Sequence, residues 1–105
     1  MASKKETLDF VLSQMEGIED IRTRRMMGEY LIYYRDKVVG GIYDDRLLVK
    51  KTPSSKALLP EVPEEIPYEG AKSMLSMSDI VFNDHRDNAV LIRKVFEVIA
   101  HDINK

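Results

Sequence analysis

The chain has 105 residues, no cysteine and a formal net charge of −2 at pH 7. This length is that of one domain with a single core, and the lack of cysteine excludes disulfides, thiolate metal sites and a cysteine nucleophile. No apolar run reaches the roughly 20 residues of a membrane span, and the first residues lack the apolar core of a signal peptide, so we expect a cytoplasmic protein.

The net charge conceals an uneven distribution along the chain. Residues 1–21 carry 2 basic and 5 acidic side chains, residues 22–56 carry 9 and 4, and residues 57–105 carry 5 and 9. The basic middle segment either presents a surface to anions or is neutralised by the acidic flanks within the fold. The second interpretation is the commoner one in a domain of nearly neutral charge.

The first predicted element is a helix over residues 4–16. Ser3 and Glu6 have the spacing of a capping box, and Gly17 is a plausible helix stop. Apolar residues in between recur at the spacing of one helix face, at Leu8, Val11, Leu12 and Met15. We expect this face to pack on a sheet.

Residues 22–51 predict a β-meander. Arg22–Met26 begins an extended region that is rich in charge, and three strand signals follow it, at Tyr30–Tyr34, Val38–Tyr43 and Arg46–Lys50. Short breaks separate them, around Gly28, at residues 35–37 and at Asp44 and Asp45, and glycine and aspartate tolerate the backbone conformation of tight hairpins. The strands are therefore antiparallel, because a parallel crossover needs a dozen residues or more.

Gly40 and Gly41 lie inside the third of these strands. A glycine pair in a strand either admits the backbone of a ligand or partner, or marks a bulge or space for a large neighbouring side chain. We favour the structural interpretation, because isolated strand glycines usually have such a role.

After the meander, Thr52 and Pro53 predict the start of a short helix that Pro60 ends. Residues 61–67 contain two prolines and are predicted to be a loop with solvated acidic side chains. Residues 73–77 predict a last strand. A final helix over about 85–103, capped by Asn83 or Asp84, follows from the apolar spacing of Ile92, Val95, Phe96, Ile99 and Ile103.

We find no motif for catalysis, a cofactor or a metal. His85 and His101 are sixteen residues apart, and at about 100° per residue they point to nearly opposite faces of the final helix, so they do not form a metal pair. Phosphate-cradling glycine patterns and a nucleophile elbow are absent. The adjacent Asp44 and Asp45 indicate a turn rather than an acid–base pair in a cleft.

Basic residues and tyrosines alternate in the meander, a mixture typical of nucleic-acid surfaces. They are Arg22, Arg24, Arg25, Arg35, Lys37, Arg46, Lys50 and Lys51, with Tyr30, Tyr33 and Tyr34. Successive strand residues face opposite sides of a sheet, so the whole set cannot form one patch. Nucleic-acid binding is therefore an alternative rather than the leading hypothesis.

Several stretches resemble the N-terminal domain of the TfoX (Sxy) family of bacterial competence regulators. They are RRMMG at 24–28, the pair Ile32 and Tyr33, and IYDDRLLVK at 42–50, with Pro67, Tyr68 and residues 74–77 similar to its later region. The family pattern runs R-x-M-F-G, an I-Y strand and a D-x-R-L-Y-L-K strand. Met27 and Leu48 depart from it, and residues 74–77 lack the family's usual tyrosine and proline.

The resemblance covers essentially the whole chain and implies an α+β fold of the secretion-chaperone type. It implies an antiparallel sheet, made of the meander and a late strand, covered by N- and C-terminal helices in the order α-β-β-β-β-α-β-α. It also implies a non-enzymatic protein-interaction or regulatory module, such as a competence-type transcription co-regulator, and a homodimer. The family's full-length regulators carry a second, helical domain, and we expect this chain, residues 1–105, to be a single-domain relative.

The family's recurring motif positions include Arg24, Gly28, Arg46 and Lys50, and the resemblance implies a backbone role for Gly28. Arg46 and Lys50 share a strand face, where they either hold an anion or acidic partner or pair with the acidic flanks. The candidate binding residues are Arg24, Arg25, Tyr33, Arg46 and Lys50. The expected structural motif residues are Gly28, Gly40, Gly41, Asp44 and Asp45. Small-anion binding is a further alternative.

Overall fold

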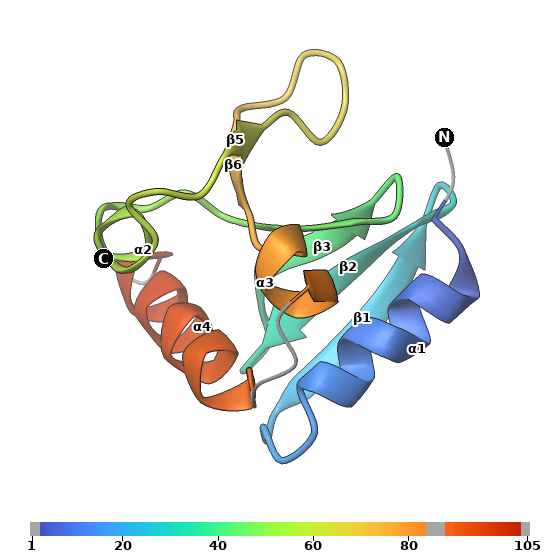
Figure 1. Ribbon diagram of the computed structural model, residues 1–105, viewed down its shortest axis with the longest axis horizontal. Coiled ribbons are helices and arrows are strands. Elements are labelled where there is room, and N and C mark those ends of the chain that lie inside the picture. Colours follow the sequence, from blue (N-terminus) through green and yellow to red (C-terminus); the bar gives the residue numbers. More distant parts are fainter. Residues whose placement is uncertain (1–2, 84–87, 104–105) are drawn as a thin grey trace.

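The computed structural model describes residues 3–83 and 88–103. Helices in these ranges are α1 (Lys5–Gln14), α2 (Pro53–Leu58), α3 (Ser78–Asn83) and α4 (Ala89–Ile103). The strands are β1 (Ile21–Met26), β2 (Glu29–Tyr34), β3 (Lys37–Tyr43), β4 (Arg46–Val49), β5 (Glu64–Glu65) and β6 (Met74–Ser76). The fold is α+β, as predicted, with helices at both ends of the chain (Figure 1).

The strands form one antiparallel sheet in the order β1-β2-β3-β4-β6-β5. The first four strands are the predicted meander, and β6 is the predicted late strand. Three two-residue turns join the meander, and all six turn residues have positive φ. They are Met27 and Gly28, Arg35 and Asp36, and Asp44 and Asp45. This pattern is typical of type I′ hairpin turns, whose twist matches that of the flanking strands.

Helices cover one face of the sheet and leave the other face without helices (Figure 1). Strand β2 shows the consequence: Tyr30, Ile32 and Tyr34 are buried toward the helices, while Leu31 and Tyr33 between them are only half-buried. The main core joins these β2 residues to apolar side chains of α1 and α4, including Val11, Val95, Phe96 and Ile99. We call the helix-free side the outer face.

Neighbouring atoms occupy the space that a side chain would need at both glycines: backbone at Gly40, and backbone together with a tyrosine ring at Gly41. A Cβ on Gly40 would lie 2.4 Å from the carbonyl oxygen of Leu48 on the neighbouring strand. A Cβ on Gly41 would lie 2.6 Å from the Tyr30 carbonyl oxygen and 2.8 Å from the Tyr43 ring. The register between β2 and β3 also shifts beside Gly40, as at a β-bulge. These contacts support the structural interpretation of the pair.

The predicted capping box of the first helix is wrong. The N-cap of α1 is Lys4, and its side chain makes no capping hydrogen bond. Ser3 instead donates to Glu29 Oε1 at 2.8 Å and accepts from the Asp45 N–H at 3.0 Å. Asp45 satisfies the helix end, since its carboxylate accepts from the Lys4 N–H and the Thr7 hydroxyl. A turn distant in sequence therefore caps α1, which sequence spacing does not reveal.

Two predictions for the second half need correction. Residues 61–67 are not all loop, because Glu64–Glu65 forms the short strand β5 at a sheet edge, where the flanking prolines are tolerated. The final helix begins at Ala89, and a separate helix, α3, precedes it. The predicted helix residues 85–87 and the cap residue Asp84 lie outside the described residues.

None of the helices described here is long and apolar enough to cross a membrane.

We predict that Gly40→Ala lowers the free energy of unfolding by about 3 kcal/mol, because a backbone oxygen occupies the space of its Cβ. Gly70→Ala is the matched control. Gly70 has nothing within 4 Å of a Cβ but a φ of +88°, so alanine there should cost only about 1 kcal/mol. Urea unfolding of both variants measures the difference. Equal costs would show that Gly40 is not needed for strand approach.

Candidate functional site

A groove crosses the outer face between the β1–β2 turn and the loop of residues 66–73. We call this loop the arch, and it joins β5 to β6 (Figure 1). The groove consists of two hollows of about 690 and 860 Å³. Both are lined by the same apolar residues: Met26, Leu31, Tyr43, Pro67 and Tyr68. Shared walls make the two hollows one continuous surface, which we call the outer groove.

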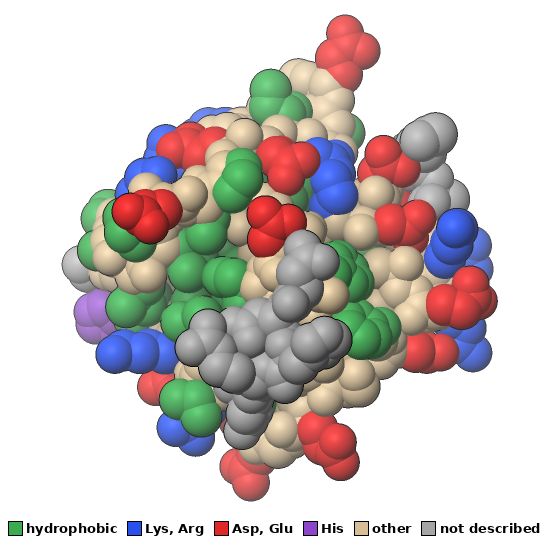
Figure 2. Space-filling view, in the orientation of Figure 1, with side chains coloured by type: hydrophobic (Ala, Val, Ile, Leu, Met, Phe, Trp, Pro, Cys, Tyr) green, Lys and Arg blue, Asp and Glu red, His purple; other side chains and the backbone are tan. Residues whose placement is uncertain are grey.

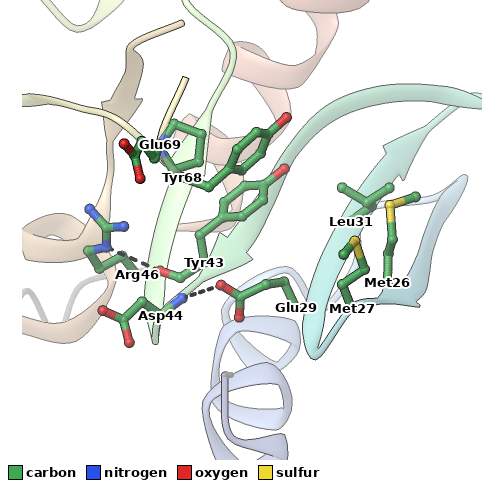
Figure 3. Close-up of a pocket in the computed structure, with 10 residues that line it drawn as sticks. Met26, Met27, Glu29, Leu31, Tyr43, Asp44, Arg46, Tyr68 and Glu69 are labelled. Carbon is green, nitrogen blue, oxygen red and sulfur yellow. Dashed lines mark hydrogen bonds between the residues drawn. The ribbon is translucent and has the colours of Figure 1, made fainter. Parts of the chain in front are cut away.

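Two tyrosines form its centre. The rings of Tyr43 and Tyr68 lie 6.3 Å apart, tilted by 53°, and they point the same way in Figure 3. Burial raises the pKa of Tyr43, and the nearby Tyr68 and Glu29 raise it further. Leu48 is fully buried on this side of the sheet although it lies outside the main core. The outer face therefore has a small apolar layer of its own.

Ion pairs fix the β5 end of the arch to the rest of the protein. Arg46 on β4 donates to Glu65 Oε1 at 2.7 Å, and this hydrogen bond holds the pKa of Glu65 below its usual value. Glu64 accepts from Lys51 at 2.9 Å and pairs with Lys56 at 3.3 Å. These bonds, chiefly the one from Lys51, lower the pKa of Glu64 from 4.5 to about 2. Of the three glutamates predicted to be solvated, Glu61, Glu64 and Glu65, the last two thus anchor β5.

The charged residues of the outer groove separate by sign. Glu29, Asp44 and Glu69 line the hollow beside the β3–β4 turn, together with Arg46. Figure 3 shows Glu29, Asp44 and Glu69 around the tyrosine pair. Lys50, Lys51 and Lys72 line the other hollow. The groove is therefore acidic at one end and basic at the other.

Exposed methionines form one rim. Met26 is 45% exposed and Met27 is 95% exposed, and Figure 3 shows both beside Leu31. Met27 occupies the first position of the β1–β2 turn with a φ of 52°. Asparagine, aspartate and glycine are the residues preferred there. A large apolar side chain is thus held in solvent by a conformation that it does not favour.

The predicted binding residues do not all gather in this groove. Arg46 and Lys50 line its two ends and share the outer face, as predicted. Arg24 and Tyr33 also face outward, and they line a separate hollow of about 310 Å³ with Arg22. Arg25 pairs with the core residue Tyr30 in the register, so it points to the helix side. The alternation of strand residues thus divides the set, as expected.

Three of the predicted motif residues lie in hairpin turns. Gly28, Asp44 and Asp45 have positive φ at hairpin turns. The Asp44 N–H donates to Glu29 Oε2 at 2.9 Å, which ties the β3–β4 turn to the start of β2. Hydrogen bonds from the Lys4 backbone and the Thr7 side chain hold the pKa of Asp45 below its usual value. The Asp45 carboxylate and the Asp44 backbone N–H thus make structural contacts.

Among residues 3–83 and 88–103, the helix-covered face has no comparable patch of one charge sign (Figure 2). Acidic and basic side chains are mixed around its periphery (Figure 2). In the described part of the chain, no three histidine or carboxylate side chains lie together as a metal site. His101 is exposed in the last turn of α4, and His85 lies outside the described residues.

Sequence reasoning missed the groove and its arch. No local sequence pattern indicates that Tyr68 lies beside Tyr43, because pairing between strands distant in sequence brings the two rings together. Met27 does carry a signal, since a methionine directly before Gly28 occupies a turn position where polar residues are usual. The acidic residues of the second half and the basic residues of the meander also indicated pairing, which Glu64 and Glu65 provide.

The chain matches the family model of the TfoX N-terminal domain over residues 13–99. The match includes the whole meander and the arch. A similar protein is the uncharacterized 12.7 kDa protein in the trpE 5′ region of Spirochaeta aurantia, which is 35% identical over 81 residues. The matched part covers 77% of this chain and 70% of that protein.

We predict that the anchor at Glu64 makes the fold sensitive to acid. The folded pKa of about 2 lies below the ordinary value of 4.5, so the carboxylate stabilises the fold above about pH 4.5 and this contribution disappears as pH falls toward 2. Thermal midpoints measured by circular dichroism across this range should fall less for Glu64→Gln than for the unmodified protein. Glu61→Gln, an exposed neighbour, should follow the unmodified protein; parallel curves for all three would refute the anchor.

Proposed function

The chain belongs to the TfoX N-terminal domain family, and from this premise we propose that it is a non-enzymatic interaction module that binds a partner protein in the outer groove. The family supports a regulatory role in the cytoplasm, such as transcription co-regulation of the competence type through that partner. The observation that carries the proposal is the conformation and exposure of Met27.

Met27 breaks a local rule without any gain for folding. The side chain is 95% exposed, so it contributes almost no burial to the core, and its φ of 52° costs about 1 kcal/mol for a residue with a side chain of this kind. Deviations of this type concentrate at functional sites. Methionine is flexible and polarizable, and it is common on surfaces that bind apolar protein segments.

The composition of the outer groove agrees with protein recognition. Aromatic residues and methionine are enriched in the centres of protein interfaces, and Tyr43, Tyr68, Met26 and Met27 provide them here. Tyr68 is 64% exposed, and its neighbour Ile66 is 56% exposed. Apolar area of this kind, framed by charged residues, marks a site for association.

We predict opposite effects of Met27→Asn on stability and on binding. Asparagine favours the turn conformation, so the free energy of unfolding should rise by about 1 kcal/mol. Loss of the apolar rim should reduce recovery of the partner about tenfold, which corresponds to about 1.4 kcal/mol. Urea unfolding measures the first effect, and affinity capture from native cell extract, treated with nuclease, measures the second.

Arg35→Asn is the matched control. Arg35 occupies the equivalent turn position between β2 and β3 with a φ of 51°, and it does not line the outer groove. This variant should keep the partner. Equal recovery with both variants would disprove the proposed site, and loss of every partner on nuclease treatment would disprove protein binding.

A second candidate function is nucleic-acid binding along β1. Arg22 and Arg24 face outward from this edge strand beside Tyr33, with the Arg22 guanidinium carbon 5.9 Å from the centre of the ring. Arginines next to a half-buried aromatic ring suit phosphate contact combined with base stacking. Arg22 also pairs with Asp36, which offsets part of its charge.

This alternative predicts an affinity for a single-stranded oligonucleotide that decreases steeply with salt. Arg24→Gln should weaken the affinity and lower the slope of log affinity against log salt by about one unit. Fluorescence anisotropy measures both quantities. Lys94→Gln on the opposite, helical side should change neither, and failure to bind at low salt would eliminate the alternative.

A further inference from the structure

The two ends of the outer groove offer opposite charges to a bound molecule. At the basic end Lys51 is paired with Glu64, whereas Lys50 and Lys72 make no ion pair with any described residue. At the acidic end Asp44 and Glu69 likewise have no ion-pair partner within residues 3–83 and 88–103. An occupant that neutralises both ends therefore carries charges of both signs.

Arg46 does not cancel the charge of the acidic end, because Arg46 is already paired with Glu65 and three of its five N–H donors are engaged. The guanidinium donates to Glu65 at 2.7 Å, to the Tyr43 carbonyl oxygen at 3.1 Å and to the Ile66 carbonyl oxygen at 3.4 Å. Its charge is matched by Glu65, which lies outside the lining of this hollow. The excess charge at this end is thus negative.

From this arrangement we propose that the outer groove binds a short extended peptide segment with an acidic end, an apolar centre and a basic end. The acidic end lies at Lys50 and Lys72, and the basic end lies at Asp44 and Glu69. The apolar centre covers Leu31, Tyr43 and Tyr68. This inference rests on the proposed protein-binding function and specifies the chemistry of the partner.

The length of the segment follows from β4. Arg46 lines the acidic hollow and Lys50 lines the basic one, so the two hollows follow each other along this strand. Four residues of a strand span about 13 Å. Asp44 lies in the turn that precedes Arg46, so an extended peptide needs at least about four or five residues to reach both charged ends, with three or more apolar residues between them.

Three synthetic heptapeptides, acetylated and amidated, test the proposal. All share a leucine-phenylalanine-leucine centre; one has two aspartates before it and two lysines after it, one has aspartates at both ends, and one has lysines at both ends. Peptides this short do not form stable helices, so they probe an extended occupant. Nuclear magnetic resonance titration of the isotope-labelled protein measures affinity and locates the contact.

We predict that the peptide with both charge signs binds at least about tenfold more tightly than the other two. Amide shifts should concentrate at Leu31, Tyr43, Leu48 and the arch, and the preference should weaken with added salt. The double variant Lys50→Glu and Lys72→Glu should instead prefer the peptide with lysines at both ends. Lys5→Glu with Lys94→Glu, exposed positions on α1 and α4, should leave the original order unchanged.

Other results overturn the inference. Equal affinity for the three peptides, shifts confined to another surface, or no shift at millimolar peptide would each contradict it. Capture of the natural partner by the variants distinguishes failure of this inference from failure of the proposed function. If Met27→Asn loses the partner but Lys50→Glu with Lys72→Glu keeps it, the groove binds protein and the charge assignment is wrong; if Met27→Asn also keeps it, the proposed site itself is wrong.

Discussion

The strands of the meander are joined by turns of the minimum length, and the rest of the structure depends on this constraint. Three consecutive two-residue turns with positive φ leave no spare residue between β1 and β4, apart from the bulge beside Gly40. Because successive strand residues face opposite sides, the turns decide the environment of every side chain. Tyr30 and Tyr34 enter the core for this reason, and Leu31, Tyr43 and Leu48 face the side without helices.

Two kinds of interaction build the outer face: apolar contacts and ion pairs. Its apolar layer is built from meander residues, whereas its charged framework links the meander to β5 through Arg46 with Glu65 and Lys51 with Glu64. Partly exposed ion pairs of this kind are individually weak, so they orient the arch more than they stabilise the domain. The position of the arch, which carries Tyr68, therefore depends on interactions sensitive to pH and salt, whereas the apolar layer is held by burial.

Local patterns were sufficient for the meander, and they failed where distant segments meet. Gly28, Asp44 and Asp45 indicated the turns because their conformational preferences act within a few residues. Ser3 and Glu6 misled, because Asp45 competes for the end of α1 and the Ser3 hydroxyl joins the hairpin junction instead. The sequence did not predict strand β5, because prolines flank it. It did not predict the outer groove either, because only strand pairing brings Met26, Tyr43 and Tyr68 together. Of the candidate residues, Arg46 and Lys50 were placed correctly on one face, and Arg25 was separated from Arg24 by alternation.

The order of strands has a consequence for how the molecule assembles. Hairpins β1–β2, β2–β3 and β3–β4 close through immediate sequence neighbours, whereas Leu48 reaches its partner Ser76 only after α2 and β5 have been synthesised. Local contacts form faster than distant ones, because less chain entropy is lost before they form. During translation the sheet therefore precedes the arch, and Leu31, Tyr43 and Leu48 pass through a stage in which their side of the sheet is open to water. A nascent chain at this stage exposes the surface most prone to premature association, so the production of intact protein depends on how quickly residues 64–76 emerge and dock.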